Sequence, residues 1–143
     1  MTRFSDTYID NLFASGTYDA LVELAGIICG WSGFAEQHPD RGLPPVALVF
    51  LETLTWFSQG IRSGSWTYFE ATSVERQLAV LSYLEGIAPA EFVERYREGV
   101  EHWRDQERMR DHDRWIDSNE SVCNQWLINL LLQNRKDLAD LFA

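Results

Sequence analysis

The stretch Ala90-Glu-Phe-Val-Glu-Arg-Tyr-Arg-Glu-Gly-Val-Glu-His-Trp-Arg-Asp105 decides the fold class of this chain. At ~100° per residue on a helix, its apolar side chains share an arc of about 100° and its carboxylates share an arc of about 80° on the other side. The apolar set is Phe92, Val93, Tyr96, Val100 and Trp103. The carboxylates, here called the acidic stripe, are Glu91, Glu94, Glu98, Glu101 and Asp105. The pattern predicts an amphipathic helix with one buried face.

Apolar residues recur at spacings of three and four through nearly all of the remaining chain, which favours helices over strands. No internal repeat, low-complexity tract or Ser/Gly linker divides the 143 residues. We therefore predict an all-α fold, with residues 1–143 forming a single domain that is a bundle of about six helices.

Caps and prolines predict the first three helices. The first begins after Ser5 and ends at Gly16, and Thr17 caps the second, which directs Leu21, Val22, Leu24, Ala25 and Ile28 inward. Gly26, Gly30 and Gly33 leave the end of the second helix open, and residues 38–45 form a loop. Pro44 and Pro45 begin a third, largely apolar helix that ends at Gly60.

Three further helices are predicted after a turn at residues 60–72. A capping box of Thr72 and Glu75 begins the fourth, which runs to Gly86 with Val74, Leu78, Leu81 and Leu84 inward. The fifth opens at residues 88–90 and is long and charged. A cap at Ser118 or Asn119 starts the sixth, with Val122, Trp126, Leu127, Leu130 and Leu131 inward, and residues 137–142 form a last short turn.

The charge of the chain restricts its partners. It has 22 acidic against 12 basic residues, a formal charge of −10, and a pI near 4.6. This charge opposes direct binding to nucleic acid or to an anionic membrane, and it favours a basic protein partner. The first residues lack a secretory signal, and the longest apolar stretch, residues 45–57, is shorter than the ~20 residues of a membrane span. We expect a cytoplasmic protein.

The acidic stripe has two interpretations. It extends over 14 residues at ~1.5 Å each, or roughly 21 Å, so it could present carboxylates to a basic surface in the way that a phosphate backbone does. Alternatively, its acids pair with Arg95, Arg97, Arg104 and Arg108 on a solvated face, each pair contributing only ~0.3–0.5 kcal/mol.

Three closely spaced aromatic residues mark the turn at residues 60–72. Trp66, Tyr68 and Phe69 could anchor a partner or seal the end of the bundle. We assign Tyr68 and Phe69 to the seal and predict that Trp66 is exposed and available as an anchor.

The sequence lacks a pattern typical of catalysis or of metal binding. Glu98 and His102 share a helix face but supply only two ligands, and no Glu-x-x-His motif occurs. The segment Asp111-His112-Asp113 is interpreted as a solvated turn. Cys29 and Cys123 have no CxxC spacing and are predicted to be buried thiols. With no nucleophile elbow and no phosphate-binding loop, we predict no catalytic residues, no metal and no cofactor.

Part of the chain resembles a known family. The turn Arg62-Ser-Gly-Ser-Trp-Thr-Tyr-Phe69 is followed by a helix and then by Glu85-Gly-Ile-Ala-Pro-Ala-Glu91. From Glu52 to about Trp103 this layout resembles a family of small bacterial helical domains that includes an acidic DNA-mimic protein. The family turn reads Asn-Gly-Gly-Phe-x-Gln-Tyr-Phe, before an Ile-Gly-Ala-like break. Three family positions are kept, Gly64, Tyr68 and Phe69, whereas Arg62, Ser63, Ser65 and Thr67 depart from the pattern. The resemblance implies an all-helical, often dimeric, non-enzymatic protein that occupies the nucleic-acid-binding surface of another protein.

These observations favour a non-catalytic protein that binds and neutralises a basic partner. The partner would be a toxin or a nucleic-acid-binding protein, with the acidic stripe supplying the electrostatic attraction and Trp66 the anchor. Two alternatives stay open. One is a helical metal-dependent enzyme that uses Glu98, His102 and acids of residues 111–117. The other is a structural subunit of a homo-oligomer, such as a homodimer, built on the apolar third helix.

Overall fold

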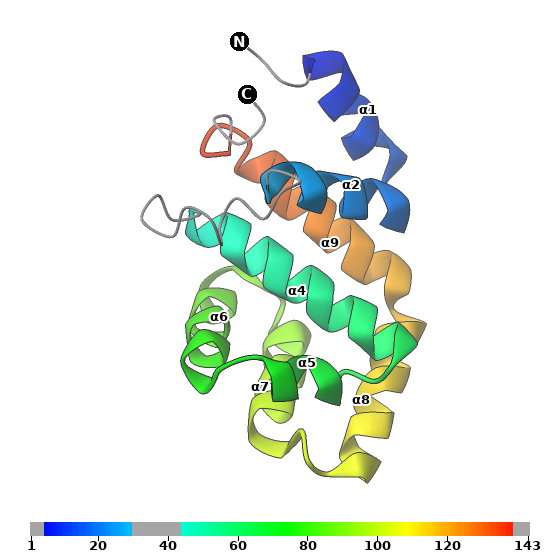
Figure 1. The fold of residues 1–143 in the computed structure, drawn as a ribbon, viewed down its shortest axis with the longest axis vertical. Coiled ribbons are helices and arrows are strands. Elements are labelled where there is room, and N and C mark those ends of the chain that lie inside the picture. Colours follow the sequence, from blue (N-terminus) through cyan, green and yellow to red (C-terminus); the bar gives the residue numbers. More distant parts are fainter. Residues whose placement is uncertain (1–4, 30–43, 139–143) are drawn as a thin grey trace. The chain divides into compact units, whose positions relative to one another are not determined.

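The computed structural model describes residues 5–29 and 44–138, and all regular secondary structure in these ranges is helical (Figure 1). The predicted all-α class is confirmed. Eight helices lie in the described ranges, against about six predicted. The difference arises because residues 66–71 form a short helix of their own and because the long charged helix is split in two. Within the same ranges, no helix combines the length and the apolarity that crossing a membrane requires.

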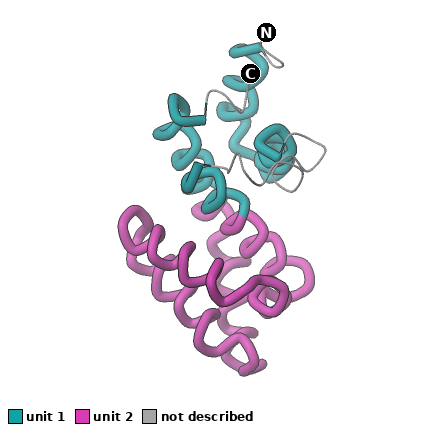
Figure 2. Tube along the Cα trace, turned by 60° about the vertical axis from the view of Figure 1, so that its left-hand side comes forward, with its two compact units in different colours: residues 1–51, 124–143 teal, residues 52–123 magenta. Residues whose placement is uncertain are grey.

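The chain divides into two compact units, one of residues 1–51 and 124–143 and the other of residues 52–123 (Figure 2). The first unit contains α1 (Asp6–Ser15), α2 (Tyr18–Ile28), the first residues of α4 (Pro45–Arg62) and most of α9 (Glu120–Gln133). The second contains the rest of α4 and of α9, together with α5 (Trp66–Ala71), α6 (Val74–Ile87), α7 (Ala90–His102) and α8 (Gln106–Ser118).

Hydrogen-bonded caps define the starts of α1 and α2 in the first unit. Ser5 Oγ accepts a hydrogen bond from the backbone N–H of Tyr8 at 3.1 Å, and Thr17 Oγ1 accepts one from Ala20 at 3.2 Å. Gly16 lies between them in the left-handed region at φ 61°, which a residue with a side chain rarely adopts. The predicted ends of α1 and the predicted cap of α2 are therefore confirmed.

The third predicted helix is α4, which begins at Pro45 as expected and ends at Arg62, two residues beyond Gly60. Gly30, Gly33 and most of the predicted loop at residues 38–45 lie outside the described residues. Near the C-terminus, a turn leads to Leu138, which is buried; the remainder of the predicted last turn is also outside the described residues.

An aromatic cluster forms the core of the second unit. Its members are Trp56, Phe57, Tyr68, Phe69, Phe92, Tyr96 and Trp115. Helix α7 lies beside α5, α6 and α8, and Gly99 allows its close approach to α5 (Figure 1). A Cβ atom at Gly99 would overlap the ring of Phe69, so a glycine is required there.

The long charged helix predicted from residue 88 onward is two helices. Helix α7 ends at His102, and Asp105 then caps α8 by accepting a hydrogen bond from the backbone N–H of Arg108 at 3.1 Å. Asp105 therefore belongs to the connection between the helices rather than to the outer face of one continuous helix. Asp is among the residues that favour this capping position.

The start of α6 also differs from the prediction. Its cap is Ser73, whose Oγ accepts from the backbone N–H of Arg76 at 3.2 Å. Thr72 instead serves the end of α5, because its hydroxyl donates to the carbonyl oxygen of Tyr68 at 2.6 Å. The predicted capping box of Thr72 and Glu75 is therefore wrong: the cap lies one residue later, and the third helical position is Arg76.

The inner face of α6 is only partly the predicted one, because Leu81 and Leu84 are buried as predicted but the residues of the first two turns differ. Val74 and Leu78 are 65% and 52% exposed, whereas Gln77 is buried. The amide of Gln77 donates to the carbonyl oxygens of Phe69 and Thr72 at 2.7 and 2.9 Å, so this polar side chain satisfies backbone groups at the end of α5. Two further residues predicted inward, Val22 and Val122, are also exposed.

Candidate functional site

Three carboxylates of the acidic stripe are hydrogen-bonded within the second unit. Glu91 Oε1 accepts from the indole N–H of Trp115 at 2.6 Å. Glu98 Oε1 lies 3.1 Å from Nδ1 of His112. Asp105 is the cap of α8. Glu91, Glu98 and Asp105 therefore hold helices in place, whatever else they bind.

The other two carboxylates of the stripe, Glu94 and Glu101, are exposed on α7. They lie seven residues apart, which places them about 10 Å from one another along one face of the helix. Glu101 lies 3.8 Å from Nε2 of His102. Among the described residues, neither Glu94 nor Glu101 forms a salt bridge with an arginine. Glu91 and Asp105 are exposed as well, so Glu94 and Glu101 are the exposed carboxylates of the stripe that do not also hold another helix.

Arginines neutralise other carboxylates of the second unit. The salt bridges join Arg95 to Glu98 and Asp111 (3.5 and 3.1 Å), Arg97 to Glu85 (3.1 Å), Arg108 to Asp105 (3.5 Å), and Arg76 to Glu52 (3.2 Å). Of the four arginines predicted to pair with the stripe, Arg95 and Arg108 do so. Arg97 pairs outside the stripe, and Arg104 instead lies over the ring of Trp103 at 4.6 Å.

His112 is fully buried at the centre of this unit, and its protonation state follows from its partners. Its Nε2 lies 2.9 Å from the indole nitrogen of Trp56, which can only donate. Nε2 is therefore the acceptor, so Nδ1 carries the hydrogen and donates it to Glu98. The ring is neutral in this arrangement, and its contact with Glu98 is a hydrogen bond rather than an ion pair.

Burial lowers the pKa of His112, outweighing the neighbouring carboxylates of Glu98 and Asp113, which act in the opposite direction. The tautomer leads to the same conclusion independently, because a proton on Nε2 would face the Trp56 N–H donor. His112 is therefore a neutral link between the aromatic core and α7.

The prediction that residues 111–113 form a solvated turn is wrong. They lie within α8, and Asp113 reaches back 48 residues: its Oδ1 accepts from both the backbone N–H and the hydroxyl of Ser65, at 3.0 and 2.5 Å. The spacing of Met109, His112 and Ile116 indicates a helix here, because it places all three residues on one helix face.

The metal site considered from the sequence is not assembled. Glu98 contacts His112 and Arg95, whereas His102 lies near Glu101. In the part of the chain that the structure describes, no group of three or more His, Cys, Asp or Glu side chains is placed to hold a metal ion.

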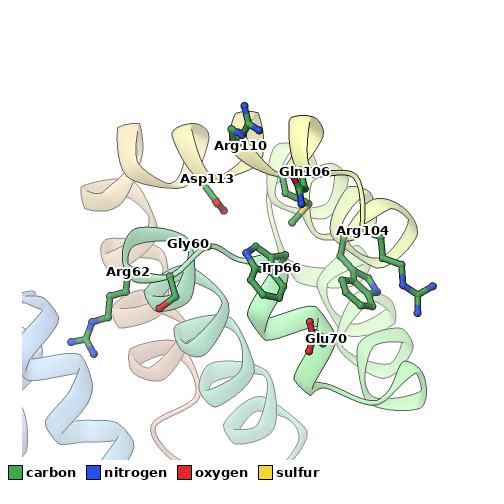
Figure 3. Close-up of a pocket in the computed structure, with 12 residues that line it drawn as sticks. Gly60, Arg62, Trp66, Glu70, Arg104, Gln106, Arg110 and Asp113 are labelled. Atoms are coloured by element: carbon green, nitrogen blue, oxygen red, sulfur yellow. The ribbon is translucent and has the colours of Figure 1, made fainter.

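Trp66 is 43% exposed and borders a cavity of about 590 Å³ (Figure 3). The cavity lies wholly within the second unit, between the end of α4, α5 and the α7–α8 connection. Trp103 and Met109 contribute apolar surface, and Glu70 and Asp113 contribute carboxylates. The predicted exposure of Trp66 is confirmed. None of the five stripe carboxylates lines this cavity.

Tyr68 and Phe69 are 2% and 1% exposed, which confirms that they seal the core. The hydroxyl groups of Tyr68 and Tyr96 lie 2.8 Å apart. Burial raises the pKa of both tyrosines, so both hydroxyls remain protonated and act as hydrogen-bonding groups inside the unit.

The two cysteines differ in burial. Cys123 is buried, and burial raises the pKa of its thiol to about 12. Cys29 is only partly buried. The prediction of a buried thiol therefore holds fully for Cys123 alone, whose neutral thiol is a poor nucleophile at neutral pH.

Comparison of the chain with family models, curated proteins and solved structures finds no match. The resemblance to the small helical domains therefore stays a prediction, and the candidate function rests on the charges and the cavity described above.

Proposed function

We propose that this chain is a non-catalytic protein that binds a basic protein and neutralises it. The partner is a toxin, which the chain inhibits as an immunity protein does, or a nucleic-acid-binding protein, which it occupies as a DNA mimic does. The observation that carries the proposal is the position of Glu94 and Glu101, two solvent-directed carboxylates on α7 without an arginine partner in the described ranges.

The charge of the second unit supports this proposal. Residues 52–123 hold 14 acidic residues against eight arginines, a formal charge of −6. A potential of this sign attracts a basic protein over about one Debye length, which is ~8 Å at physiological salt. Glu94 and Glu101 contribute to that potential without holding the fold, unlike Glu91, Glu98 and Asp105.

Two separate parts of the second unit contribute to binding in this proposal. The outward carboxylates of α7 accelerate encounter with the partner, and Trp66 provides a large contact that slows dissociation. These sites need not be adjacent, because electrostatic steering acts before contact.

The two alternatives have less support. The side chains of a metal-dependent enzyme are not brought together in the described ranges. For the homo-oligomer, the apolar face of α4 is already buried within the chain, at positions that include Phe50, Leu54 and Trp56. Burial of these side chains therefore needs no second copy.

Charge reversal tests the proposal. The chain is immobilised, exposed at low salt to lysate of the cells that produce it, and eluted at high salt. The association rate of the basic protein recovered is then measured with wild type and with Glu94→Arg/Glu101→Arg. We expect an association rate lower by about tenfold at low salt, and a difference that narrows as salt increases.

The matched control is Glu75→Arg/Asp117→Arg, which makes the same charge change at exposed positions on α6 and α8. The proposal predicts a clearly smaller effect of this control. Equal rates for the two double variants, or an affinity independent of salt, would contradict the placement of the interaction on α7.

A further inference from the structure

The cavity beside Trp66 has aromatic walls. The ring of Trp66 lies directly against Gly64, where an added Cβ atom would be 2.8 Å from both Cδ1 and Nε1 of the indole. Gly64 has a φ of 101°, so the backbone and the space both favour glycine there. Trp103 and the buried Met109 line the same cavity. Its volume of about 590 Å³ is typical of ligand-binding sites, which span ~300–1,000 Å³.

The charged groups around this cavity point in different directions. Figure 3 shows the carboxylates of Glu70 and Asp113 on the side of Trp66, whereas the guanidinium groups of Arg62, Arg104 and Arg110 are directed away from it. The guanidinium of Arg104 lies over the ring of Trp103. The interior of the cavity is therefore acidic and aromatic, and its arginines belong to the rim.

The two carboxylates are not equivalent. Asp113 uses Oδ1 for two hydrogen bonds to Ser65, and its Oδ2 has no partner among residues 5–29 and 44–138. Glu70 is exposed and forms no hydrogen bond or salt bridge with another described residue. Glu70 can thus pair with a cation without breaking a contact that holds the fold.

We propose that this cavity binds a guanidinium or ammonium side chain of the basic partner. The cation lies against the indole of Trp66, which attracts it through its π face, and Glu70 supplies the opposite charge. The volume accommodates a long basic side chain together with its flanking backbone. This inference rests on the proposed function and specifies where its anchor acts.

The experiment is an NMR titration that follows the indole N–H resonances of Trp66 and Trp103. The probe is Nα-acetyl-arginine amide. Nα-acetyl-citrulline amide, which has nearly the same shape without the charge, and inorganic phosphate are run in parallel. We expect the arginine probe to shift both indole resonances, and the other two to leave them unchanged. Equal shifts with citrulline, or shifts with phosphate alone, would overturn the assignment of a cation site.

Variants locate the site. Glu70→Gln should weaken binding of the arginine probe by about threefold to fivefold, and Trp66→Ala by a similar factor, since each contact is worth up to ~1 kcal/mol when exposed. Glu75→Gln on α6, outside the cavity, should leave the affinity unchanged. Because Trp66 and Glu70 are exposed, we expect these variants to fold, which far-ultraviolet circular dichroism checks.

The outcomes separate this inference from the proposed function. If reversal of Glu94 and Glu101 slows capture of a basic partner while Glu70→Gln binds the arginine probe as wild type does, the cation site is wrong and the proposed function stands. If the probe binds at Trp66 but no reversal affects capture, the cavity binds cations and the proposed role of α7 is wrong.

Discussion

Acidification should destabilise the fold through His112. The ring is buried and neutral in the folded chain because Nε2 accepts from Trp56 and Nδ1 donates to Glu98. In the unfolded chain, the same histidine has a pKa near 6.5. Below that pH the unfolded chain binds a proton that the folded chain excludes, so the stability present above pH 6.5 declines as the pH falls toward the lower pKa of the folded state.

The size of the effect has an upper limit. One proton taken up only by the unfolded chain changes the free energy of unfolding by at most ~1.4 kcal/mol per pH unit. Integrated from pH 7 to pH 5 with an unfolded pKa of 6.5, the largest loss that a single histidine can cause is about 2 kcal/mol. This is a measurable part of the ~5–15 kcal/mol by which folded domains are stable.

The assay is urea unfolding at pH 7, 6 and 5, compared between wild type and His112→Gln. The variant should be less stable at pH 7 but should lose less stability on acidification, because glutamine does not titrate. Carboxylates titrate in both proteins, so the difference between them isolates His112. His102→Gln, a change at a partly exposed histidine, is the control and should follow wild type. Equal losses in wild type and His112→Gln would refute the assignment of a neutral buried ring.

Two further predictions concern close packing and the inner carboxylates. Gly99→Ala should lower the free energy of unfolding by about 1–3 kcal/mol because the methyl group would overlap Phe69, whereas Gly86→Ala, with open space around its Cβ, should raise it by about 0.5–1 kcal/mol; urea unfolding measures both. Destabilisation by both substitutions would contradict the packing described. Glu91→Ala should cost about 1–2 kcal/mol by removing the acceptor of the Trp115 indole, and unchanged stability would mean that this hydrogen bond contributes little.

Local signals in the sequence predicted the parts of the fold that depend on neighbouring residues. The caps Ser5 and Thr17, the end of α1 at Gly16 and the start of α4 at Pro45 are decided within one helical turn, and all were predicted correctly. The burial of Tyr68 and the exposure of Trp66 were also predicted, from the crowding of aromatics in a short segment.

Two kinds of feature were not predicted: residues whose local pattern fits two roles, and polar side chains whose partners lie on another helix. Asp105 could continue the acidic face of one helix or cap the next, and only the path of the chain decides between these roles. Gln77 is buried because carbonyl oxygens at the end of α5 need donors, which a hydrophobic pattern does not reveal. His112 is a similar case, because its two hydrogen-bond partners lie on other helices. Trp56 precedes it by 56 residues and Glu98 by 14.

The hydrogen bonds between Asp113 and Ser65 link the order of chain synthesis to the cavity beside Trp66. A nascent chain that ends before α8 already contains Trp66, but it lacks the carboxylate that holds the start of α5. It also lacks Met109, and thus one wall of the cavity. The cavity can form only after α8 has been made and has packed against the earlier helices. A partner that needs it would therefore recognise completed copies of this unit and ignore partial ones.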